Sequence, residues 1–139
     1  MPEQPHDRRA ARAERADAHR EAQRRQRAQE SAKAQVLLDR FVDEARRAGI
    51  ATEELTARPW SGGRRYRTGI SGWYLRNDGS VGVDADGRYY ELVVAPVRFG
   101  RWRTVRVEPT APPLQVGEGA RDGESIALAD LVEIRLRRS

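Results

Sequence analysis

The chain lacks cysteine, which excludes disulfides, thiolate nucleophiles and cysteine-bound zinc. It also lacks any apolar run near the ~18 residues that a membrane-spanning helix needs. The charges at the N-terminus are not followed by an apolar block, so this end does not match a secretory signal. These absences predict a cytoplasmic protein without a membrane partner.

Lysine and asparagine are nearly absent, since Lys33 and Asn77 are the single copies, yet the formal net charge is +5. A basic chain favours a nucleic-acid partner in general. Here almost all the positive charge is arginine, which a GC-rich genome favours through its codons, and acidic residues are interleaved throughout. Charge alone therefore does not identify nucleic acid as the partner.

Residues 1–35 contain no leucine, isoleucine, valine or aromatic residue. Alanine, arginine, glutamate and glutamine, all good helix formers, make up most of this segment. Without an apolar stripe it can join neither a core nor a coiled coil. The sequence predicts that residues 1–35 form a charged arm, which is either a solvated helix or disordered. The alternative is an arm that becomes ordered when it binds nucleic acid or an acidic partner.

Apolar residues return at helical spacing from Val36 to Ala48, and Gly49 favours the end of that helix. Alternating apolar residues between Gly72 and Val94 are typical of three strands with one apolar face. Asp-Gly pairs between the runs, at Gly79 and Gly87, favour tight hairpin turns.

Residues 36–139 are therefore predicted to form one α+β domain. Its elements are an N-terminal helix, an antiparallel β-meander of five or six strands in a roll or half-barrel, and a C-terminal helix containing Leu128 and Leu131. Residues 117–124 are predicted to form a loop before that last helix.

Little in the sequence supports catalysis or metal binding. The only histidines, His6 and His19, lie in the arm. The stretch from Asp84 to Gly87 resembles the middle of a calcium loop, but the two anchor positions hold Gly82 and Val93. We therefore predict no enzyme activity, no catalytic residue, no cofactor and no metal ligand.

Arginines and aromatic residues are interleaved in one predicted strand: Arg98, Phe99, Arg101, Trp102, Arg103 and Arg106. Arginines on phosphates, with aromatic rings stacked on bases, are how proteins hold single-stranded nucleic acid. This hypothesis takes Arg98, Arg101, Trp102, Arg103 and Arg106 as the binding residues, with Arg64, Arg65 and Arg67 added if the strands are neighbours. The alternative, which we favour at this point, is that Phe99 and Trp102 pack into the core or cover a sheet edge with the arginines outward.

Two stretches carry a resemblance to other proteins: Gly72 to Arg76, and the C-terminal segment from Val116 to Leu131. They resemble a group of small uncharacterised proteins from high-GC actinobacteria, in which a charged N-terminal extension precedes a compact domain. The resemblance implies an origin and a domain boundary, but no active residues.

Together these patterns predict a non-catalytic cytoplasmic interaction or adaptor module whose partner is another protein. The alternative is an RNA- or DNA-associated accessory protein that uses the arm and the Arg98–Arg106 strand.

Overall fold

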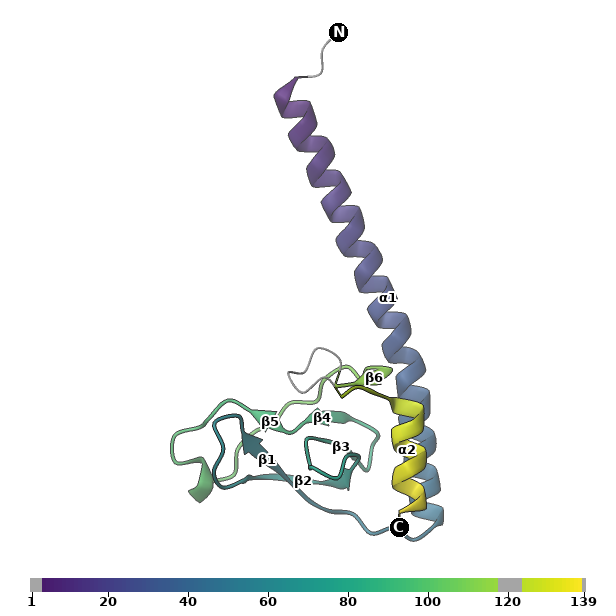
Figure 1. The fold of residues 1–139 in the computed structure, drawn as a ribbon, viewed down its shortest axis with the longest axis vertical. Helices are drawn as coiled ribbons and strands as arrows, with labels where there is room; N and C mark the ends of the chain where they lie inside the picture. The colour runs from purple at the N-terminus through teal and green to yellow at the C-terminus, as the bar shows by residue number, and fades with distance from the viewer. Residues whose placement is uncertain (1–3, 118–123, 139) are drawn as a thin grey trace.

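A single long helix dominates the shape of the molecule. The structure, a computed structural model, describes residues 4–117 and 124–138, so most of the loop predicted over 117–124 lies outside the described residues. Helix α1 (Pro5–Arg47) projects from a sheet that lies to one side of its C-terminal end, so the two form an L (Figure 1). The predicted helix from Val36 is confirmed, and it continues outward through the arm without a break.

The main sheet has five strands in the order β4-β3-β2-β1-β5. Their bounds are β1 Glu53–Pro59, β2 Tyr66–Tyr74, β3 Val81–Asp84, β4 Tyr89–Glu91 and β5 Val93–Val94. Three pairs are antiparallel, but β5 runs parallel to β1. The prediction of a purely antiparallel meander is therefore wrong, because the sheet is mixed.

The parallel pair arises because β4 and β5, the two outer strands of the sheet, belong to one extended segment. Leu92, fully buried, is the single residue between β4 and β5. Its N–H donates to the Ser80 carbonyl at 2.8 Å, and its carbonyl accepts from the Arg58 N–H at 2.7 Å. The chain thus passes from the β3 side to the β1 side at Leu92, and the predicted roll is corrected to a sheet in which no barrel closes.

The C-terminal part packs against the base of α1. Strands β6 (Gln115–Val116) and β7 (Ile126–Ala127) form a separate antiparallel pair. Helix α2 (Leu128–Arg137) follows and lies alongside the C-terminal half of α1 (Figure 1). The predicted C-terminal helix is confirmed, and the chain has the predicted α+β class.

The sheet buries apolar side chains on both faces. On the helix side, Phe41 of α1 meets Trp73 edge-on, with ring centroids 5.9 Å apart, and the Trp73 indole N–H donates to the Ile50 carbonyl at 3.0 Å. On the other side, Tyr90 and Leu92 pack with Leu55 in a second cluster. A meander with one apolar face is therefore not what forms.

The two predicted Asp-Gly turns are confirmed. Gly79 and Gly87 have φ values of +71° and +85°, a region in which a side chain is strained. Asp78 supports the first turn by accepting from the Ser80 N–H at 2.9 Å. Both hairpins therefore depend on the Asp-Gly pairs from which they were predicted.

The predicted strand over Arg98–Arg106 does not form. Pro96 lacks an N–H for a ladder, and Phe99 then turns the chain with φ of +58°. A short 3-10 helix, η1 (Gly100–Trp102), follows, and only an isolated bridge from Arg67 to Thr104 resembles sheet pairing there. Within the described ranges, no helix combines the length and the apolar character needed to cross a bilayer.

Candidate nucleic-acid interface

Large aromatic side chains gather at the end of the sheet that lies away from α1. This end is formed by η1, drawn in green in Figure 1, and by the loop that follows β1. The exposed fractions are 72% for Trp60, 58% for Phe99 and 66% for Trp102. Because burial of such a side chain contributes roughly 1.5–3 kcal/mol to folding, three exposed rings at one end of a small domain make this end the candidate site.

Arginines lie over two of these rings. The Arg101 guanidinium carbon is 4.0 Å from the centroid of Trp102, and that of Arg98 is 5.1 Å from the centroid of Phe99. The two rings are 5.9 Å apart and tilted by 36°. This arrangement places positive charge beside exposed ring faces, the combination that phosphates and bases require together. We call Trp60, Phe99, Trp102, Arg64, Arg98 and Arg101 the aromatic–arginine surface.

The backbone that presents this surface is strained and tightly packed. Among the described residues, Phe99 is the one non-glycine with positive φ, and such strain is typical of functional positions. Next to it, a Cβ on Gly100 would lie 2.7 Å from the Tyr66 ring, so only glycine lets η1 pack so closely on β2. The Tyr66 hydroxyl accepts from the Val97 N–H at 3.2 Å and ties the loop to the sheet.

A shallow hollow of about 190 Å³ opens beside the rings. Tyr66 and Pro59 contribute to its walls, while Arg64 and Arg101 bring charge to it. Its size and its lining of ring and guanidinium suit one planar group held by stacking.

The structure brings some of the predicted binding residues together and separates others. Arg98, Arg101 and Trp102 share the surface, and the exposed Arg103 follows η1 directly. Arg106 lies beyond the bridge at Thr104 and pairs with Glu108 at 2.5 Å.

Of the three β2-side arginines, only Arg64 joins the surface. Arg65 is turned inward and donates to the Thr56 carbonyl at 2.6 Å and to the Gly79 carbonyl at 2.8 Å. Arg67 pairs with Glu54 at 3.3 Å. The interpretation that Phe99 and Trp102 pack into the core is wrong, since both rings are exposed.

Trp60 was missed by the sequence reasoning, although a signal for it was present. In the sequence of β1, the apolar residues Leu55, Ala57 and Pro59 alternate with polar ones, and these three are the buried positions of the strand. Continuing that period puts Trp60 on the outward side. Its N–H donates to the Val94 carbonyl at 2.9 Å, which holds the residue beside β5 and the loop that leads to η1.

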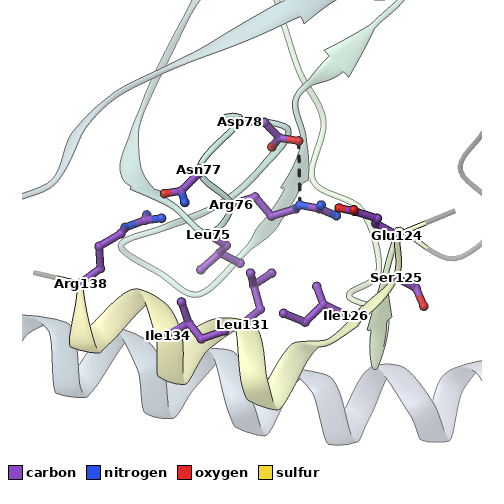
Figure 2. A pocket seen from close by; sticks show the side chains of 10 residues that line it. All are labelled: Leu75, Arg76, Asn77, Asp78, Glu124, Ser125, Ile126, Leu131, Ile134 and Arg138. Carbon is purple, nitrogen blue, oxygen red and sulfur yellow. Dashed lines mark ion pairs between the residues drawn. The ribbon is translucent and has the colours of Figure 1, made fainter. Parts of the chain in front are cut away.

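A larger pocket of about 580 Å³ lies between the β2–β3 turn and α2 (Figure 2). Its floor includes Leu75 and Leu131, and the side chain of Arg76 extends above them, with its Nε 3.9 Å from Asp78 (Figure 2). Burial acts to raise the pKa of Asp78, but hydrogen bonds from Ser80 and the charge of Arg76 outweigh it and leave the pKa lowered. The pocket thus holds an ion pair over an apolar floor.

The acidic turn after β3 has a structural use. The Asp84 carboxylate accepts from the N–H groups of Asp86 and Arg88 at 2.9 and 3.0 Å and from the Tyr90 hydroxyl at 2.9 Å. Both of its oxygens are engaged in closing the turn. The described part of the chain contains no group of three or more carboxylates and histidines placed to hold a metal ion.

No protein-family model, curated protein or solved structure matches the chain. The resemblance to actinobacterial proteins therefore stays a prediction, and the assignment of a function depends on the aromatic–arginine surface itself.

Proposed function

We propose that this protein is a cytoplasmic, non-catalytic interaction module that binds single-stranded RNA or DNA through the aromatic–arginine surface. The observation that carries the proposal is the Arg101 guanidinium 4.0 Å above the exposed ring of Trp102. A base stacked on the ring's free area would have its phosphate within reach of the same arginine.

Single strands suit this surface better than duplexes do. Stacking on a side chain needs a base whose face is free, and each such contact is worth about 1–3 kcal/mol. Three exposed rings, Trp60, Phe99 and Trp102, offer several contacts along one strand. Because every base has a ring face, the proposal predicts affinity with little sequence preference.

A protein partner is the second candidate, and the same exposed side chains support it. Tryptophan and arginine are the residue types that contribute most energy to protein–protein interfaces. The two candidates differ in their dependence on salt, because binding to phosphates releases condensed counterions whereas burial of apolar area does not.

The test is binding of a labelled strand of about 10 nucleotides, within the range of known single-strand site sizes, followed by a salt titration. Full-length protein should bind at low salt and release the strand at high salt. Trp60→Ala and Trp102→Ala should each weaken binding by roughly 5- to 100-fold, the equivalent of one lost stacking contact. Val36→Ala, which trims an exposed apolar side chain on α1, is the matched control and should bind normally.

A result against the proposal would be absence of salt-sensitive binding to the strand. Weakened binding in all three variants alike would also count against it, because Val36 is remote from the aromatic–arginine surface. Equal melting temperatures of the variants would show that any loss concerns the surface and not the fold.

A further inference from the structure

In the exposed arm of α1, from Pro5 to Lys33, five of the eight arginines lie within about 60° of one line along the helix. Arg9, Arg27 and the buried Ala45 are eighteen residues apart in turn, which is about five full turns at ~3.6 residues per turn. Arg20 lies seven residues before Arg27, close to the same line. This arginine face therefore continues, along the free part of the helix, the side that packs on the domain.

Three of the five acidic residues of the arm lie on a different side. Asp7, Glu14 and Glu21 are spaced seven apart on a strip roughly 120–160° around the helix from the line of Arg9 and Arg27, at ~100° per residue. Asp17 and Glu30 lie closer to that line, roughly 60–80° from it. Arg20 pairs with Asp17, which lies beside it, and Arg24 pairs with Glu21 at 2.8 Å. The half of the arm centred on the arginine line holds five arginines and two carboxylates, whereas the other half holds four cations and three carboxylates. A polyanion is therefore attracted more strongly to the arginine half.

The composition of the arm indicates which kind of polyanion it is suited to bind. Between Pro5 and Lys33 alanine is the one aliphatic type apart from the first proline, and no phenylalanine, tyrosine or tryptophan is present. A helix without an apolar face does not lie in a lipid interface, and a helix without these rings has nothing on which unpaired bases stack. A straight, charged helix about 44 Å long instead suits phosphates that are already held at regular positions, as they are in a duplex.

We propose that this arginine face is a second nucleic-acid contact, one that holds the phosphates of a double-stranded segment. The proposal rests on the proposed function for the other end of the molecule, where the aromatic–arginine surface takes unpaired bases. Because the two surfaces occupy the two limbs of the L (Figure 1), the ligand class is a nucleic acid in which a paired segment adjoins an unpaired one. Holding both parts at once makes the second contact intramolecular, which raises affinity without any new contact.

The experiment uses the full chain and three labelled DNA probes. They are a strand of about 10 nucleotides, a duplex of about 13 base pairs to match the length of the arm, and that duplex with the strand as a tail. Affinity is measured over a range of salt for each probe. The tailed duplex should bind at least ~10-fold more tightly than the strand alone.

Two triple variants of equal charge separate the arginine face from net charge. The first is Arg9→Gln with Arg20→Gln and Arg27→Gln, all on the arginine face. The second, Arg25→Gln with Arg40→Gln and Arg47→Gln, removes the same charge from exposed positions about half a turn around the same helix. Glutamine is a good helix former, and circular dichroism checks that the helix content is kept.

The first variant should lose the advantage of the tailed duplex and lower the slope of log affinity against log salt by about 2 to 3, since each phosphate contact contributes ~0.9. The second variant should keep the advantage to within about twofold, because its charges point away and are screened beyond a Debye length of ~8–10 Å. Equal losses in the two variants, or a tailed duplex that binds no better than the strand, would overturn the inference.

The same data distinguish failure here from failure of the proposed function. Strand binding that depends on Trp102 but gains nothing from a duplex would leave the proposed function standing and overturn the role of the arm. Duplex binding without any strand binding would contradict the proposed function. It would also contradict the inference that the ligand joins a paired segment to an unpaired one. Failure of all three probes would contradict both and point to an acidic protein as the partner of the arm.

Discussion

The two parts of α1 have the same backbone geometry and opposite surroundings. From Ala34 onward the helix places Leu38, Phe41 and Ala45 in the core, whereas the part before it is exposed along nearly its whole length. Most helices in proteins are stabilised by packing of an apolar face. The exposed part instead has strong helix formers and a packed segment that it extends, so it needs no new nucleus.

The two parts of α1 therefore have different roles. The packed part contributes stability through the apolar side chains that it buries. The exposed part contributes little stability and presents its charges to solvent, with the arginines concentrated on one half of the helix. The sheet shows the same division, with a tightly packed middle and the aromatic–arginine surface at the far end.

The largest expected effect comes from removing a ring from the packed part. Phe41→Ala should lower the free energy of unfolding by about 3–5 kcal/mol, because Phe41 is 1% exposed and packs edge-on against Trp73. Val36→Ala, on the exposed side of the same helix, should change it by less than about 0.5 kcal/mol. Urea unfolding of the two variants measures the contrast, and similar losses would contradict the division of α1.

A smaller effect is expected at a turn of the domain. Gly79→Val should lower the free energy of unfolding by roughly 1 kcal/mol or more, since Gly79 has φ of +71° and Arg65 lies 3.1 Å from where a Cβ would be. Gly49→Ala is a useful comparison, because that glycine also has positive φ but open space around it. A melt in which Gly79→Val is as stable as wild type would refute a tight turn at this position.

Removal of the arm, although it deletes many residues, should change the free energy of unfolding only slightly. A chain starting at Lys33 should unfold within about 1 kcal/mol of the full-length protein, because the residues removed bury almost nothing. Among the contacts removed, we expect the hydrogen bond that the Glu30 carboxylate accepts from the Leu114 N–H at 3.1 Å to contribute most to any loss of stability. A drop of several kcal/mol in thermal or urea melts would mean that the arm packs on the domain.

The smallest effect concerns pH. The folded-state pKa of Asp78 lies below the ordinary value of 3.8, so its carboxylate adds stability above that value, and this stability is lost as the pH falls through the folded pKa. Asp78→Asn should therefore cost only about 0.5 kcal/mol or less near neutral pH, given the exposure of the group to solvent. The difference from wild type should disappear in acid melts below pH 3.8, and a difference that grew there would show that the sign is wrong.

Local periodicity was enough to predict most of the elements, but not η1, the β6–β7 pair or the pairing of the strands. The helix from Val36, the hairpins at Gly79 and Gly87 and the final helix all follow from spacing within short stretches. The parallel contact of β5 with β1 depends on where Leu92 carries the chain, and no short stretch encodes it.

The candidate site was predicted in part for a similar reason. Arg98, Arg101 and Trp102 were recognised by residue type, but their exposure depends on the positive φ of Phe99 and on the close packing of Gly100 against Tyr66. The line of Arg9, Arg20 and Arg27 along the arm is readable from spacing alone. Which side faces the domain becomes clear only when Ala34 and Ala45 are seen to be buried.

The central claim, that the aromatic–arginine surface binds single strands, is tested most directly by comparing salt slopes in two variants. With a strand of about 10 nucleotides, the triple variant Arg98→Gln, Arg101→Gln and Arg103→Gln should flatten the slope of log affinity against log salt by about 2, at ~0.7 per phosphate contact. Trp102→Ala should weaken binding while the slope stays unchanged, because stacking releases few counterions. Unchanged affinity in the triple variant would contradict the account.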